Sequence, residues 1–146
     1  MIRTDKRMRL CTALLICNLV FIWGNSLLPG EVSGAVSDCV RQILEELVPG
    51  GAKEELGGGR LRKLAHFTEF TALGLLLGWL FGMLKKKQAW PMLCGISAAC
   101  MDETIQRFVP GRGPSIKDVC IDSCGVLTGL ILLYLGHTYL KRKHKK

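Results

Sequence analysis

Ionisable side chains recur at helical spacing inside segments that are otherwise apolar. Arg62, His66 and Glu69 follow one another at i, i+4 and i+7, which places them on one face of a helix. Two later segments place acidic or amide side chains at i, i+4 spacing. Imidazole and carboxylate groups serve as general acids and bases, and guanidinium groups bind phosphates and carboxylates. The ten candidate site residues are Arg62, Lys63, His66, Glu69, Asp102, Glu103, Gln106, Arg112, Asp118 and Asp122.

The segments that carry these residues are long and poor in charge. Four of them stand out, at residues 8–28, 64–84, 89–109 and 116–140. Each is long enough to cross a hydrocarbon core of about 30 Å, which takes about 20 helical residues. A soluble helical bundle would show a polar outer face, and the second and fourth segments have none over most of their length. We therefore predict an all-α polytopic membrane protein, a four-helix transmembrane bundle that forms a single domain over residues 1–146.

Basic residues gather at three sites that fall on one side of a four-span bundle. Four lie before the first segment, three between the second and third, and five in the tail, so these sites hold twelve of the 20 lysines and arginines. Only Asp5 among the acids shares that side. This positive-inside bias predicts both termini in the cytoplasm and a multi-pass protein of the plasma membrane. No nucleic-acid partner is expected, because the sequence shows no soluble domain with aromatic or groove-reading elements.

The longest connection follows the first segment and has two parts. Val32–Val48 has apolar residues near a 3.6-residue period, typical of an amphipathic helix that lies at the outer interface or packs on the outer end of the bundle. Pro49–Gly59 contains five glycines and is predicted to be a loop. The first segment could instead be a signal peptide, but its apolar stretch extends to Leu28 and its removal would leave an odd number of spans. We expect a retained helix.

A common depth links the ionisable groups. At a rise of about 1.5 Å per residue, Glu69, Asp102 and Asp122 lie roughly 10–13 Å from the predicted outer ends of their helices. Stripes of small residues run into this layer and allow neighbouring helices to approach closely. We therefore expect the polar groups to face neighbouring helices rather than lipid. The stripes are Gly74, Gly78 and Gly82; Gly95 and Ala99; and Gly125 and Gly129.

Several candidates also have structural interpretations. Asp118 follows Ser115 as S-x-x-D, typical of a capping box. Lys63 is expected to extend toward the outer interface, and Arg112 could pair with an acid and hold the turn before the last helix. The buried carboxylates could form an ion-paired core, although charge inside a membrane is usually functional or paired. No cofactor can be named, and the cysteines and histidines show no metal-binding spacing, so neither a metal site nor a disulfide framework is expected.

Three motifs, in this order and spacing, resemble the VanZ-like family of bacterial integral membrane proteins. They are RKLAHFTEF followed by Leu73-Gly74, then DETIQRFVPGR at residues 102–112, then Asp118-Val119 with Asp122-Ser123-Cys124-Gly125. GNSLLPG, at residues 24–30, is similar to the end of that family's first helix. Phe70 departs from the pattern, because Tyr is common there. The resemblance covers nearly the whole chain and implies a link to low-level resistance to the glycopeptide teicoplanin, but it assigns no catalytic residue.

Three functions are open at this point. In the first, which we favour, the polar layer binds or modifies a lipid-linked cell-wall precursor or a lipid-tailed glycopeptide at the outer leaflet of the cell envelope. In the second, His66, Glu69 and the acids of the third segment are acid–base groups of an intramembrane enzyme that acts on a polyprenyl or phospholipid substrate. In the third, the protein is structural or binds a partner, and its polar core is ion-paired. Membrane lipid is an expected partner.

Overall fold

The computed structural model describes residues 2–47, 58–87 and 89–143, and the predicted all-α class is confirmed over these residues. No strand occurs among them. The five helices are α1 (Ile2–Ser26), α2 (Gly30–Leu47), α3 (Gly58–Met83), α4 (Ala89–Gln106) and α5 (Ile116–Lys143). Most of the predicted glycine-rich loop, residues 49–57, lies outside the described residues, whereas Gly58 and Gly59 already belong to α3.

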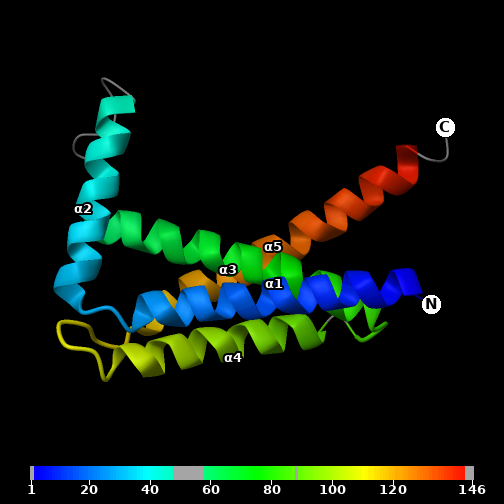
Figure 1. Cartoon of the computed structure of the whole chain (residues 1–146), viewed down its shortest axis with the longest axis horizontal. Coiled ribbons are helices and arrows are strands. Elements are labelled where there is room, and N and C mark those ends of the chain that lie inside the picture. Colours follow the sequence, from blue (N-terminus) through cyan, green and yellow to red (C-terminus); the bar gives the residue numbers. More distant parts are fainter. Residues whose placement is uncertain (1, 48–57, 88, 144–146) are drawn as a thin grey trace.

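The helices α1, α3, α4 and α5 run along the long axis of the molecule, and α2 crosses them at one end (Figure 1). Successive long helices alternate in direction, so both chain ends and the α3–α4 connection lie at the end of the bundle remote from α2. The three basic sites of the sequence therefore belong to the same end. The α1–α2 corner and the α4–α5 connection lie at the opposite end (Figure 1).

Three of these helices are long and apolar enough to span a membrane: Asp5–Ser26, Gly59–Met83 and Ile116–Lys143. The protein is therefore a membrane protein. α4 has 18 residues and would span roughly 27 Å, but it is less apolar because its last two turns hold Asp102, Glu103 and Gln106. It packs against α1, α3 and α5. A fourth span, and the cytoplasmic position of both termini, stay predictions.

Glycines bring α3 and α5 into the most extensive contact of the bundle. A Cβ atom added to Gly74 would fall on the Val126 carbonyl of α5, and one added to Gly129 would fall on the Thr71 carbonyl of α3. The backbones can approach this closely only because side chains are missing there. Gly82, predicted to continue the stripe, faces open space and takes no part in this contact.

A glycine pair also locks the end of the bundle that carries α2. The Gly30 amide donates a 3.0 Å hydrogen bond to the Pro110 carbonyl, and the Gly111 backbone lies against the Gly30 Cα. Gly111 has φ +73°, in the left-handed region that favours glycine. α4 ends at Gln106 rather than at the predicted Val109, and the turns that follow hold the α4–α5 connection against the start of α2.

The amphipathic helix predicted at Val32–Val48 is observed as α2 and packs on α3. Much of its apolar face stays uncovered, since Val36 is 54% exposed and Ile43 is 51% exposed. α2 thus packs on the end of the bundle, as one of the two interpretations predicted. Its exposed apolar side chains are also compatible with contact with lipid.

Candidate functional site

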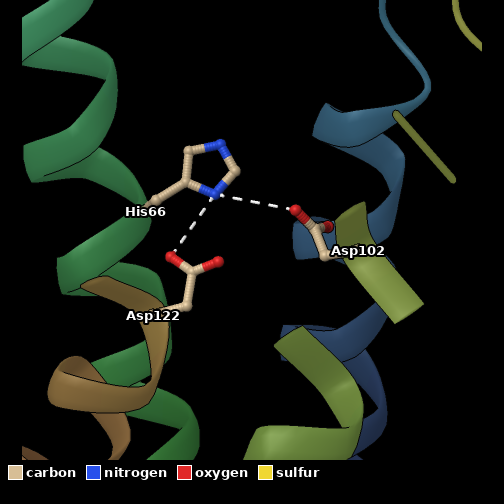
Figure 2. A group of neighbouring side chains, drawn as sticks. All are labelled: His66, Asp102 and Asp122. Atoms are coloured by element: carbon tan, nitrogen blue, oxygen red, sulfur yellow. Dashed lines mark ion pairs between the residues drawn. The ribbon is translucent and has the colours of Figure 1, made fainter. Parts of the chain in front are cut away.

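Side chains from three helices meet in the half of the bundle nearer α2. His66 comes from α3, Asp102 from α4 and Asp122 from α5. The His66 Nδ1 atom lies 3.7 Å from Asp102 Oδ2 and 3.8 Å from Asp122 Oδ1. Figure 2 shows this ring nitrogen turned toward both carboxylates, and the second ring nitrogen directed away from them. The three residues therefore form one cluster, which we call the His–Asp–Asp cluster.

Asp102 is held in a fixed orientation by two buried partners. The Ser26 hydroxyl of α1 donates a 2.6 Å hydrogen bond to Asp102 Oδ1. The Gln106 amide donates to Asp102 Oδ2 at 2.8 Å, and also contacts the Ser26 hydroxyl oxygen at 3.3 Å. All three side chains are buried. This network fixes the Asp102 carboxylate relative to α1 and along α4.

Asp122 has a different environment. Its side chain is 0% exposed, and within the described part of the chain neither carboxylate oxygen has a hydrogen-bond partner. His66 Nδ1 likewise has no hydrogen-bond partner there. Nearly all buried polar atoms in folded proteins are hydrogen-bonded, so unpartnered atoms that face one another call for an explanation.

Glu103 connects the end of α4 with the start of α5. Its Oε2 atom accepts a 2.6 Å hydrogen bond from the backbone amide of Ser115, and the Ser115 hydroxyl accepts one from the Asp118 amide. Half of the predicted capping box is thus confirmed. In a capping box the Asp118 carboxylate would also accept a hydrogen bond from the Ser115 amide. This half of the prediction is wrong, because Glu103 accepts that hydrogen bond and the Asp118 carboxylate lies 4.0 Å from Lys63 Nζ.

Two arginines, the histidine and one acid line a cavity of about 100 Å³ beside the cluster. We call it the polar chamber; its polar lining includes Arg62 and His66 of α3, Glu69, Asn25 and Arg112. The Asn25 amide donates a 3.1 Å hydrogen bond to Glu69 Oε1. Within the described residues Arg112 does not form the ion pair that the sequence suggested, and its guanidinium donates a hydrogen bond of 3.5 Å to the Ser26 carbonyl. Burial, and next the charge of Arg62, lower the pKa of Arg112 from its ordinary value.

An apolar groove of about 420 Å³ adjoins the polar chamber. It lies between α2 and α3, and Val40, Leu61 and Leu64 form part of its wall. We call it the α2–α3 groove. The groove and the chamber share four lining residues, namely Val36, Ser37, Ala65 and Glu69.

A second apolar groove, of about 430 Å³, lies on another side of the bundle between α1 and α4. Trp23, Trp90 and Leu93 are in its wall, and its lining in the described part of the chain includes no charged side chain. We call it the α1–α4 groove. The two grooves are alike in volume, but only the α2–α3 groove shares its wall with the polar chamber.

The structure therefore divides the ten predicted residues into three groups. The His–Asp–Asp cluster holds His66, Asp102 and Asp122, with Gln106 as a support; the wall of the polar chamber holds Arg62, Glu69 and Arg112; and Lys63, Glu103 and Asp118 lie around the Ser115 cap. Sequence reasoning missed Asn25 and Ser26, which bond to Glu69 and Asp102. Their signal was the short polar patch at the end of an otherwise apolar first segment.

Residues 11–137 match the family described as VanZ/LLP1. The chain belongs to the VanZ/LLP1 family. The match extends over most of α1 and α5 and all of α2, α3 and α4, so it contains the His–Asp–Asp cluster, the polar chamber and both grooves. Comparisons with curated proteins and with solved structures give no match. Membership of the family indicates a membrane protein related to glycopeptide resistance.

Proposed function

We propose that the protein binds an amphiphilic ligand with an anionic head group at the outer leaflet of a bacterial plasma membrane, and thereby affects the response to glycopeptides of the teicoplanin type. A lipid-linked cell-wall precursor and a lipid-tailed glycopeptide are the two ligands with this chemistry. The observation that carries the proposal is the shared wall between the polar chamber and the α2–α3 groove. One site thus offers a polar compartment and an apolar one side by side.

The anionic group of the head, a phosphate or a carboxylate, belongs in the polar chamber, whose volume of about 100 Å³ suits a group of that size. Arg62 and Arg112 supply two cationic side chains to its wall, and guanidinium groups bind phosphate and carboxylate with charge-assisted hydrogen bonds. Glu69 Oε2 has no hydrogen-bond partner among the described residues and can accept one from a hydroxyl or amine of the ligand. The chamber therefore favours an anionic head group that also carries hydrogen-bond donors.

The lipid tail belongs in the α2–α3 groove. Val36 and Val40 of α2 face Leu61 and Leu64 of α3 across it. A tail that enters the groove leaves another apolar environment, lipid or detergent, so it contributes by packing against these side chains and not by removal from water. The basic residues at the other end of the bundle support an orientation in which α2 and the chamber lie on the outer side.

A binding experiment with matched ligands tests the proposal. The purified full chain in non-ionic detergent is titrated with a polyprenyl phosphate, with the corresponding uncharged polyprenol, and with a short water-soluble phosphate ester. We expect the polyprenyl phosphate to bind at least tenfold more tightly than either of the others, since it alone fills both compartments. Equal binding of the phosphate and the polyprenol would contradict a role for the chamber.

Two variants separate the compartments. Arg112→Gln keeps a polar side chain but removes the charge, and should weaken binding of the polyprenyl phosphate while leaving the polyprenol unchanged. Leu93→Gln, in the wall of the α1–α4 groove, is the control and should change neither. In cells, loss of the gene should alter sensitivity to a lipid-tailed glycopeptide more than to one without a tail. The same change with both drugs would contradict the lipid-tail part of the proposal.

An enzymatic function is favoured by one observation, the contact of His66 with both the polar chamber and two buried carboxylates. A histidine between a ligand cavity and carboxylates is a suitable general acid or base. Mass spectrometry of the polyprenyl phosphate after incubation with the protein checks this alternative. A hydrolysed or transferred head group would make the protein an enzyme, whereas recovery of intact lipid supports binding alone.

A further inference from the structure

We propose that His66, Asp102 and Asp122 bind a divalent cation, with Mn²⁺ and Zn²⁺ as the ions best matched to the donor set. The sequence shows no metal-binding spacing, and it could not, because the three side chains come from three different helices. The structure brings together one ligand atom from each, all within 4.8 Å of one another. This inference is independent of the amphiphile proposal.

The spacing suits a single ion. Ligand atoms that share one ion at bond lengths of about 2.0–2.4 Å lie roughly 3–4.5 Å apart. His66 Nδ1 lies 3.7 Å from one carboxylate and 3.8 Å from the other, too far for hydrogen bonds but within this range. Figure 2 shows the three groups turned toward a common point, where an ion would lie.

The unpartnered atoms of the cluster point to a ligand. Asp122 is fully buried, and both of its carboxylate oxygens lack a hydrogen-bond partner within the described residues, as does His66 Nδ1. An ionised carboxylate in such a place is costly unless a charge or a metal compensates it. Two ionised aspartates and one divalent cation sum to zero charge, so a bound ion removes the cost for both carboxylates at once.

One of the three proposed ligands, Asp102, already has hydrogen-bond partners of the kind that metal sites require. Carboxylate ligands are themselves hydrogen-bonded in metal sites, and these partners fix their orientation. Ser26 and Gln106 do this for Asp102, with bonds of 2.6 and 2.8 Å. The His66 ring presents Nδ1 to the carboxylates and directs its other nitrogen away from them (Figure 2).

The donor set selects the class of ion. One imidazole favours a first-row transition ion over Mg²⁺ or Ca²⁺, while two carboxylates are hard ligands that suit Mn²⁺ as well as Zn²⁺. Three protein ligands leave at least one coordination position open, as in catalytic rather than structural zinc sites. His66 also lines the polar chamber, so an ion on its Nδ1 would lie one side chain away from a head group bound there.

Mn²⁺ is the better first probe, because the chain has seven cysteines that would compete for Zn²⁺. The full chain, free of any affinity tag and stripped with a chelator, is titrated with Mn²⁺ in non-ionic detergent, and free Mn²⁺ is counted by electron paramagnetic resonance. We expect one Mn²⁺ per chain at micromolar free ion. Asp122→Asn should weaken binding at least tenfold, whereas Asp38→Asn, which removes an exposed carboxylate on α2, should leave it within twofold.

A melting experiment gives a second test on the same samples. Saturating Mn²⁺ should raise the melting temperature of the wild-type chain by about 5 °C or more and leave that of Asp122→Asn unchanged. The metal-free variant should melt no lower than metal-free wild type, because it loses an uncompensated buried charge. His66→Gln, which removes another of the three ligands, should likewise weaken Mn²⁺ binding at least tenfold and abolish the shift in melting temperature.

Three results would overturn the proposal. The first is the absence of stoichiometric Mn²⁺ and Zn²⁺ binding by the wild-type chain. The second is equal binding by wild type and Asp122→Asn. The third is a metal-free Asp122→Asn chain that melts well below wild type, which would show that a protonated His66 and Asp122 form an ion pair instead.

Discussion

The hydrogen bond from Ser26 to Asp102 offers a sharp test of how the cluster is held. Ser26 is completely buried, and its hydroxyl donates to Asp102 Oδ1 at 2.6 Å while its oxygen lies 3.3 Å from the Gln106 amide. Ser26→Ala removes both contacts and leaves a buried carboxylate oxygen without its donor. Hydrogen bonds to charged groups contribute about 1.5–3 kcal/mol. We therefore expect the free energy of unfolding to fall by about 2 kcal/mol.

A loss of this size should lower the melting temperature of the detergent-solubilised chain by roughly 4–8 °C. Ser97→Ala is the matched control, because the Ser97 hydroxyl is exposed and bonds only to the Leu93 carbonyl of its own helix. Its melting temperature should stay within about 1–2 °C of wild type. Equal melting temperatures for Ser26→Ala and wild type would refute the reasoning that Ser26 stabilises Asp102.

Two further changes test the packing around the site. Gly129→Ala places a methyl group on the Thr71 backbone and should cost about 1–3 kcal/mol of unfolding free energy. Gly136→Ala, in the same helix but facing open space, should be neutral or stabilising by up to about 1 kcal/mol, and thermal melting compares the two. Glu103→Ala removes the acceptor for the Ser115 amide and should cost about 1–3 kcal/mol. Hydrogen exchange should then show faster opening at the start of α5, and unchanged exchange there would contradict the assigned cap.

Helix periodicity in the sequence predicted the structural features that depend on a single helix. The run of low-charge residues predicted all four long helices, and the i, i+4 spacing placed Arg62 and His66 on a common face of α3, where both line the polar chamber. The glycine stripes predicted close contact, which Gly74 and Gly129 make. Such features follow from the geometry of a single helix and from the composition of its faces.

Features that depend on how helices rotate against one another could not be predicted in this way. The i, i+4 spacing of glycines predicted that Gly82 would also lie in the helix contact. It faces open space instead, because α3 and α5 diverge beyond the close contact. A capping box is a local rule, and it failed where Glu103, twelve residues before Ser115, supplied a competing acceptor. His66, Asp102 and Asp122 come together only because α3, α4 and α5 are each rotated to face the same point, and the sequence of one helix does not determine this.

The central claim is that a lipid tail lies in the α2–α3 groove while its head group lies in the polar chamber. Photo-crosslinking tests this most directly: a polyprenyl phosphate with a diazirine in its tail is bound, irradiated, and mapped by peptide mass spectrometry. The α1–α4 groove, of nearly the same volume but without charged lining residues, is an internal control. The account predicts labelling concentrated on α2 and the first half of α3, around Val40 and Leu64, and reduced by Arg112→Gln. Equal labelling of both grooves, or labelling around Trp90 and Leu93 alone, would contradict it.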